Sequence, residues 1–240
     1  MTAPLIIDGD APILIIADHA SNRVPPGVDL GIDAALLGNH IAVDIGTEAL
    51  AMALAAAMDA PAIIANVSRL VIDMNRDPGA TGLIPTASDG HVIAGNLALS
   101  KLDRELRINA IHAPYHAAIA AEVSSRRPAM LISLHSFTQR LLVSAEDARP
   151  WPVGILYNED DRAARHGLAA LAARGLHVGD NQPYSGRDLN YTMNRHAEAS
   201  EIPYLGFEIR NDGLGDLAGV AHWMTVLADT IHHARRQLAR

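Results

Sequence analysis

The sequence contains no cysteine, which excludes disulfide bonds and thiolate ligands to a metal. A chain without cysteine fits a reducing compartment. No apolar run approaches the roughly 20 residues that a membrane-spanning helix needs. The first residues also lack the basic segment and apolar stretch that are typical of a signal peptide. We therefore expect a soluble, cytoplasmic protein with no membrane partner.

Positive charge is scarce as well. The chain has 19 lysines and arginines against 27 aspartates and glutamates, which gives a formal net charge of −8. Nucleic-acid binding usually needs a basic face, whereas the arginine pairs at 126–127 and 235–236 are interpreted as solvated helix ends. We expect no nucleic-acid partner. A small anionic molecule could still bind at individual arginines.

Several motifs of common enzyme classes are missing. The sequence has no phosphate-binding P-loop, no Gly-x-Gly-x-x-Gly after a strand, and no Gly-x-Ser-x-Gly. Ser21, Ser133 and Ser136 lie next to histidines in the sequence. A sequence neighbour does not establish a nucleophile–base pair, so these serines give weak support for a serine hydrolase.

The chain has the apolar content of a globular protein, at 49% hydrophobic residues. No break in composition or low-complexity linker divides it, so we expect a single domain over 1–240. Alternating strand and helix patterns predict an α/β fold, a three-layer α/β/α sandwich with a mixed, partly parallel sheet. The expected strands are 12–17, 61–65, 129–134, 141–144, 152–157 and 203–208. The expected helices are 36–58, 101–126 (capped by Ser100 and kinked at Pro114), 160–174, 191–200 and 216–238, with long loops at 77–96 and 179–187.

Three of the expected strands run into polar residues. The first ends at Asp18-His19, the run 129–134 ends at His135, and the strand from 203 ends at Glu208. Open α/β sheets place their chemistry at the carboxyl ends of strands. Two histidines and a glutamate in such places predict a metal site, although each histidine alone could be a hydrogen-bonded structural residue.

Zinc sites that hydrolyse amides commonly use two histidines and one carboxylate, and they leave a position for water. His19 and His135 are the histidine candidates. The third ligand has two candidates. Asn22 has the favourable spacing from His19 but a weak amide oxygen, and Asp44 has the better ligand chemistry but a less certain location.

The remaining site candidates are a base and several anion-binding groups. Glu208 is a candidate general base, because partial burial would raise its carboxyl pKa; its alternative is an ion pair with Arg210. Arg69 and Arg76 could each grip a substrate carboxylate, or could instead pair with nearby aspartates. Arg210 is a further candidate for contacting substrate. His196 could contact substrate or support the residues that do, and exposure on a helix surface is equally plausible for it.

Four segments together resemble the zinc carboxypeptidase superfamily. They are His19-Ala-Ser-Asn22, Met74-Asn75-Arg76, Ser133-Leu-His135-Ser136-Phe137 and Phe207-Glu208-Ile209-Arg210. The closer resemblance is to the N-formylglutamate amidohydrolase family, over roughly residues 15–212. It is carried by Asp18-His19, Val67-Ser-Arg69, Asp73-x-Asn75-Arg76, Pro114-Tyr115-His116, Asn181-x-Pro-Tyr184-x-Gly186, Tyr191-Thr with His196, and Glu208-Ile-Arg210.

The resemblance implies a carboxypeptidase-like fold and one zinc ion held by His19 and His135, with Glu208 as the base toward water. It also implies that Arg76, with Asn75 beside it, binds a substrate carboxylate. Where carboxypeptidases have a ligand glutamate, this chain has Asn22. The segment around Asp44 is similar to an acidic stretch of the amidohydrolase family, so both candidates for the third ligand stay open.

The first hypothesis from the sequence is a zinc-dependent hydrolase of an N-formyl or N-acyl amino acid, such as N-formyl-L-glutamate. The second is a related metallo-carboxypeptidase or deacylase that acts on another carboxylate substrate. The third, prompted by Asn22, is a non-catalytic binding protein on the same fold.

Overall fold

A computed structural model of the chain describes residues 2–144, 146 and 148–240. Its main sheet has seven strands in the order β1-β3-β2-β6-β9-β7-β8. Four of the strand pairs are parallel, and the pairs β1–β3 and β7–β9 are antiparallel. The strands are β1 (Leu5–Ile7), β2 (Ile13–Ala17), β3 (Ala62–Ile64), β6 (Met130–Phe137), β7 (Val153–Leu156), β8 (Val178–Asp180) and β9 (Tyr204–Arg210).

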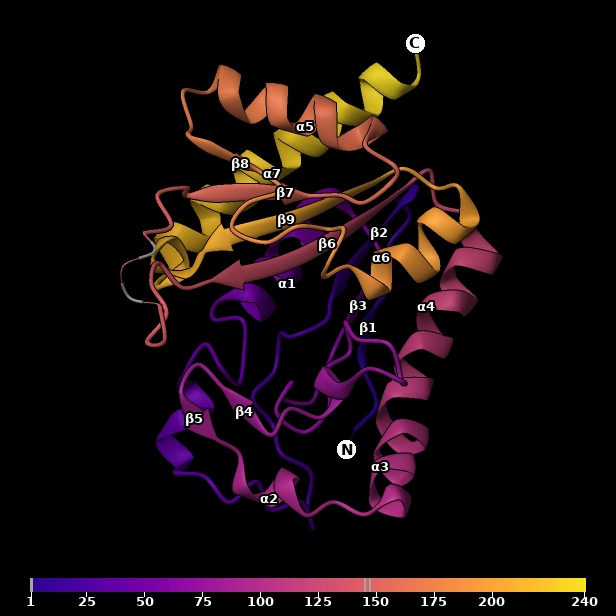
Figure 1. Cartoon of the computed structure of the whole chain (residues 1–240). Helices are drawn as coiled ribbons and strands as arrows, with labels where there is room; N and C mark the ends of the chain where they lie inside the picture. The colour runs from indigo at the N-terminus through magenta and orange to yellow at the C-terminus, as the bar shows by residue number, and fades with distance from the viewer. Residues whose placement is uncertain (1, 145, 147) are drawn as a thin grey trace.

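Helices flank this sheet. Helix α7 packs against α1 and α5, while α1 also contacts β2, β3 and β6 and α5 contacts β7, β8 and β9. Figure 1 shows α5 and α7 along one side of the molecule and α4 along another. The predicted α/β fold with a mixed sheet is therefore confirmed. The helices are α1 (Thr47–Met58), α2 (Ala94–Leu97), α3 (Lys101–Arg107), α4 (Ala113–Arg126), α5 (Arg162–Ala173), α6 (Tyr191–His196) and α7 (Leu217–Leu238).

The central strands β2 and β6 are buried along their whole length, which is why they form continuous apolar runs. From β2 the chain proceeds to β3 on one side, while β6 lies on the other. Ligands bind at such a topological switch point, outside the carboxyl ends of the strands. Within the described residues, no helix is long and apolar enough to cross a membrane.

The long helical stretch expected over 101–126 is confirmed with its cap at Ser100. The Ser100 side chain accepts a hydrogen bond from Asp103 N, and the Asp103 carboxylate accepts one from Ser100 N, which is a capping box. A wide turn of π-helix over Ile108–His112 separates α3 from α4, and Pro114 lies in the first turn of α4.

Two expectations about local structure were wrong. The helix expected over 36–58 begins only at Thr47, since Gly46 has φ +82 and the preceding segment is held to β2 by the bond from Asp44 N to His19 O (2.9 Å). The strand expected over 141–144 does not form. The backbone N–H groups of Leu142 and Val143 are bound by the Asp89 carboxylate, so they have no strand partner.

The two segments expected to be loops contain short elements. Residues 77–96 hold a helical turn at Thr81–Leu83, the hairpin of β4 (Ala87–Ser88) and β5 (His91–Val92), and most of α2. The segment 179–187 begins with the last two residues of β8. The helix expected over 191–200 ends at His196 and is followed by a separate turn at Glu198–Ser200.

Candidate metal centre

Three neighbouring parallel strands deliver the polar groups of the site. His19 follows the end of β2, His135 lies near the end of β6, and Glu208 lies in β9 directly opposite His135 in the register. Paired residues on adjacent strands extend their side chains to the same face, about 4.8 Å apart at the backbone. The sheet therefore aims His135 and Glu208 into one cavity of about 360 Å³, which His19 also lines.

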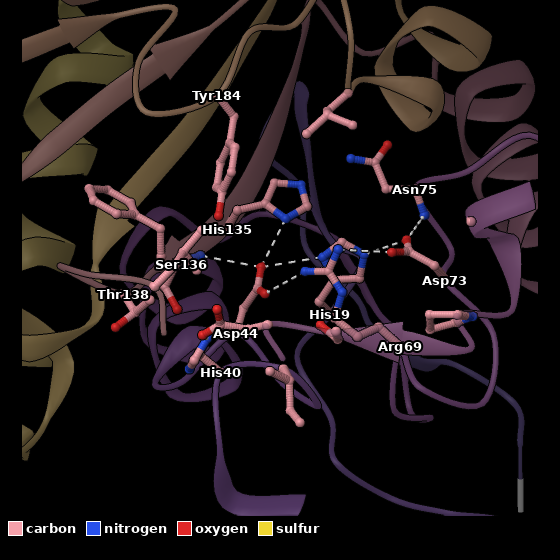
Figure 2. A pocket seen from close by; sticks show the side chains of 18 of the residues that line it. His19, His40, Asp44, Arg69, Asp73, Asn75, His135, Ser136, Thr138 and Tyr184 are labelled. Carbon is pink, nitrogen blue, oxygen red and sulfur yellow. Dashed lines mark hydrogen bonds and ion pairs between the residues drawn. The ribbon is translucent and has the colours of Figure 1, made fainter. Parts of the chain in front are cut away.

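The buried side chains of His19, Asp44 and His135 form a group that could hold a metal ion. One potential ligand atom from each lies within 4.8 Å of the others. Oδ2 of Asp44 lies 3.0 Å from Nδ1 of His135 and 3.4 Å from Nδ1 of His19. Figure 2 shows the two rings on the same side of the Asp44 carboxylate. Two imidazoles and one carboxylate are a donor set that suits Zn²⁺.

The opposite nitrogen of each ring faces another carboxylate. Nε2 of His19 lies 2.7 Å from Oδ1 of Asp73, and Nε2 of His135 lies 3.6 Å from Oδ2 of Asp18. Histidines that bind a metal usually donate the other ring N–H to a carboxylate or carbonyl, which fixes the tautomer. The arrangement therefore leaves both Nδ1 lone pairs for a metal ion, and the residues present fit a bound Zn²⁺.

Asp18 itself is held in place by hydroxyl groups. Its Oδ1 accepts hydrogen bonds from Tyr115 Oη (2.8 Å) and from Thr192 Oγ1 (3.0 Å), which come from α4 and α6. Both helices thereby fix the carboxylate behind His135. The site is supported from two elements that contribute no ligand.

The local charges favour a cation between the two histidines. Burial would lower the pKa of His135, but the nearby carboxylates of Asp18 and Asp44 raise it well above its ordinary value. Burial would raise the pKa of Asp44, but His19 and His135 hold it well below its usual range. The ionised Asp44 thus favours positive charge at the His19 and His135 rings. A divalent cation bound there would be stabilised by the same negative charge.

Glu208 has the properties of a general base. It is 5% exposed, and its Oε2 atom has no hydrogen-bond partner among the described residues. Burial raises the pKa of Glu208 to about 7, against the opposing charge of His135. A carboxylate that titrates near neutral pH can both accept and return a proton under physiological conditions.

The two candidate arginines differ in their partners. Arg69 donates to Asp44 Oδ1 (3.3 Å) and to Asp73 Oδ2 (2.8 Å). Its guanidinium therefore bridges the candidate metal ligand Asp44 and the carboxylate of Asp73, which contacts His19. Arg76 also lines the cavity, but its guanidinium has no ion pair or hydrogen bond among the described residues. Asn75, which lines the cavity as well, accepts a bond from Thr192 N at its Oδ1, and this leaves its Nδ2 free to donate.

The sequence model of the N-formylglutamate amidohydrolase family matches residues 11–214. This chain belongs to the N-formylglutamate amidohydrolase family. The expected resemblance is thereby confirmed.

Two solved structures resemble the chain over nearly its whole length. The crystal structure of gene product Atu2144 from Agrobacterium tumefaciens is 28% identical, with a TM-score of 0.95 over 100% of this chain and 97% of that one. The structure of N-formylglutamate amidohydrolase from Ralstonia eutropha JMP134 is 20% identical, with a TM-score of 0.74 over 98% of each chain. The latter supports the shared fold. No functionally curated protein gave a significant sequence match.

Three residues predicted for the site do not line the cavity, and one of them, His196, lies behind it. Asn22 is exposed and does not line the cavity, whereas Asp44 does. His196 is buried behind the site, where its Nε2 lies 2.9 Å from Nδ1 of His116. Arg210 pairs with Asp212 at 2.8 Å and lies outside the cavity lining.

The His196–His116 pair lies against the segment that contains Asn75 and Arg76. Nε2 of His116 contacts the Met74 carbonyl at 2.9 Å, and Nε2 of His112 contacts the Arg76 carbonyl at 3.0 Å. These bonds fix the backbone on both sides of Asn75. His196 thus supports this backbone through His116.

Sequence reasoning missed several cavity residues. Tyr184 lines the cavity and accepts a hydrogen bond at Oη from the buried Arg149 (3.0 Å). His40 and Asp89 also line the cavity, and Nε2 of His40 lies 2.9 Å from Oδ2 of Asp89. The motif Asn181-x-Pro-Tyr184 pointed to Tyr184, but no local signal links Asp89 to a site that is built from distant segments.

Proposed function

We propose that this chain is a zinc-dependent amidohydrolase that cleaves the amide bond of an N-formyl or short N-acyl amino acid. The products are formate, or the corresponding acid, and the free amino acid. N-formyl-L-glutamate, the compound in the family name, is the reference substrate. The observation that carries the proposal is the placement of Glu208 beside the His19, Asp44 and His135 group.

Each residue has a chemical task in this reaction. A bound Zn²⁺ would supply Lewis-acid polarisation of the amide carbonyl and a lowered pKa of water. Glu208 takes a proton from the attacking water, whose oxygen forms the new bond to the carbonyl carbon. Glu208 then gives the proton to the leaving nitrogen as the carbon–nitrogen bond breaks. The unpartnered Oε2 of Glu208 is the oxygen available for this transfer.

The substrate would be held by its carboxylate. Arg76 offers a guanidinium that has no hydrogen bond or ion pair among the described residues, and the Nδ2 of Asn75 offers a second donor beside it. A planar guanidinium can bind a carboxylate through two parallel hydrogen bonds. The proposed partner is therefore a small anionic molecule.

The experiment is formate release by purified protein loaded with one equivalent of Zn²⁺. The panel contains N-formyl and N-acetyl amino acids, together with a short peptide that has a free carboxyl terminus. We expect hydrolysis of at least one N-formyl amino acid and loss of this activity in Glu208→Gln. If the zinc-loaded protein hydrolyses no N-formyl or N-acetyl compound in the panel, the proposal is wrong. Cleavage of the peptide alone would assign a carboxypeptidase instead.

A further inference from the structure

The cavity offers few cations to a substrate. Of its two arginines, Arg69 is committed to Asp44 and Asp73 through bonds of 3.3 and 2.8 Å. Because the positive charge of this guanidinium is already offset by two carboxylates, it attracts a third carboxylate only weakly. Arg76 is the arginine of the lining that has no such partner within the described part of the chain.

The fold keeps the Arg76 guanidinium accessible. A Cβ atom placed on Gly82 would lie 3.8 Å from both Cζ and Nε of Arg76, so a larger side chain at position 82 would grow over this group. Gly82 lines the same cavity. The glycine therefore leaves one face of the guanidinium open to a ligand.

The groups around the metal ligands carry an excess of negative charge without Arg76. Asp44, Asp73, Glu208 and Asp18 would together carry four negative charges when ionised, whereas Arg69 and a divalent ion would supply three positive ones. Arg76 would bring the sum to zero. One substrate carboxylate at Arg76 would then leave one unmatched negative charge, and a second carboxylate would double it.

Apart from Arg69 and Arg76, the described residues that line the cavity include no arginine or lysine for a second carboxylate. The lining includes the apolar side chains of Ile41, Pro85, Ala87, Phe137, Leu141 and Val143 and the hydroxyl groups of Ser88, Ser136 and Thr138. The charged group among them is Asp89, whose oxygens accept bonds from Leu142 N, Val143 N and His40 Nε2. His40 is thus already paired with a carboxylate, and Asp89 would repel another one.

A further guanidinium, that of Arg149, is bound to residues of the cavity wall. Arg149 does not line the cavity, and its Nη1 donates to Tyr184 Oη (3.0 Å) and to the Thr138 carbonyl (3.3 Å). Its Cζ atom lies 4.9 Å from the centre of the Tyr184 ring. Tyr184, whose ring extends into the site in Figure 2, therefore lines the cavity with a neutral hydroxyl between the cavity and Arg149.

We propose that the substrate carries one carboxylate, which Arg76 binds, and an uncharged side chain that lies against the apolar and hydroxyl-bearing residues of the cavity wall. The preferred compounds are then N-formyl or N-acyl derivatives of neutral amino acids, in place of the dicarboxylic N-formylglutamate. This inference rests on the proposed function, because it concerns the specificity of the same site.

An isosteric pair of substrates tests the inference. N-formyl-L-glutamine and N-formyl-L-glutamate have nearly the same shape and differ by one charge. We expect the zinc-loaded protein to hydrolyse the glutamine compound with a kcat/KM at least about tenfold higher, since an unmatched charge at a few ångströms costs more than the energy of a tenfold change. An equal or higher kcat/KM for N-formyl-L-glutamate would overturn the inference while it supports the proposed function. Failure to hydrolyse either compound, or any other N-formyl or N-acetyl amino acid, would instead contradict the proposed function itself.

Two variants separate the roles of the arginines. Arg76→Met should raise the KM for N-formyl-L-glutamine by roughly 10- to 100-fold, the range expected for a lost charged hydrogen bond. Arg140→Met is the matched control, because Arg140 is exposed and lies outside the cavity lining. It should leave the glutamine-to-glutamate ratio unchanged. A selective loss of N-formyl-L-glutamate hydrolysis in Arg140→Met would reveal a second carboxylate-binding cation and overturn the inference.

Discussion

Nδ1 of His135 lies 3.0 Å from Oδ2 of Asp44, although the two residues are 91 positions apart in the sequence. The contact joins the end of a central strand to a loop that is tied to β2 through the bond from Asp44 N to His19 O. The same Asp44 oxygen lies 3.4 Å from Nδ1 of His19. This carboxylate is therefore the point at which the candidate metal ligands converge.

The first prediction concerns the third ligand. Asp44→Asn keeps the shape of the side chain but replaces a carboxylate oxygen with a weaker amide oxygen. We expect zinc affinity to fall by roughly 100-fold or more, beyond the range typical of residues behind the ligands. Titration with a competing chelator measures the affinity. Asn22→Ala is the control and should bind zinc like the wild type, because Asn22 is exposed outside the cavity. The opposite result, with zinc lost in Asn22→Ala alone, would assign the ligand to Asn22.

The second prediction concerns the carboxylate behind His19. Asp73→Asn weakens the 2.7 Å contact to His19 Nε2 and the ion pair with Arg69. We expect zinc affinity to fall by about 10- to 100-fold while the ligands remain present. Asp77→Asn is a suitable control, since Asp77 is exposed and binds the backbone of Gly79. Unchanged zinc affinity in Asp73→Asn would show that this carboxylate does not support the site.

The third prediction separates chemistry from metal binding. Glu208→Gln removes the proton acceptor and leaves the three ligand side chains in place. We expect full zinc content with a turnover that is roughly 10²- to 10⁴-fold lower, the usual contribution of a general base. Zinc content and formate release should be measured on the same preparation. Wild-type turnover in this variant would mean that another group accepts the proton.

The fourth prediction concerns acid stability and the histidine pair behind the site. Burial lowers the pKa of His116 to about 3 and that of His196 to about 4, whereas both would titrate near 6.5 in an unfolded chain. Between pH 6.5 and pH 4 the unfolded state therefore binds more protons than the folded state. The stabilisation is fully present above pH 6.5 and is lost as the pH drops toward 4. Each histidine can contribute up to about 1.4 kcal/mol per pH unit to this loss.

Urea unfolding of the metal-free protein at pH 7 and pH 5 measures the effect. His196→Gln cannot be protonated, and comparison with the wild type at each pH cancels the contributions of other titrating groups such as His112. From pH 7 to pH 5, the free energy of unfolding should fall by about 1–2 kcal/mol less in the variant than in the wild type. An identical pH dependence in both proteins would show that His196 is not held neutral.

The sequence predicted much of the fold because apolar runs mark buried strands directly. β2, β6 and β9 were expected near their observed places, and their polar ends located His19, His135 and Glu208. The location of Asp44 could not be predicted in the same way. It depends on a backbone bond to His19 and on a left-handed Gly46, and both interrupt a pattern that favours a helix.

The direction of polar side chains was the weakest part of the sequence prediction. For His196 the sequence left open substrate contact, a supporting position and surface exposure; in the structure its ring stacks on His116 at a centroid distance of 5.2 Å, a partner 80 positions away. The pattern at 141–144 favoured a strand, but the Asp89 carboxylate takes the backbone N–H groups that a strand would need. Such contacts depend on long-range packing that no local window of sequence contains.

The most direct test of the account is the metal dependence of formate release from N-formyl amino acids. The protein is treated with a chelator, shown by elemental analysis to be metal-free, and then titrated with Zn²⁺ while hydrolysis of N-formyl-L-glutamine and N-formyl-L-glutamate is followed. We predict no hydrolysis without metal and full recovery at one zinc per chain, with no recovery in His135→Ala. Undiminished hydrolysis by the metal-free protein would contradict the account.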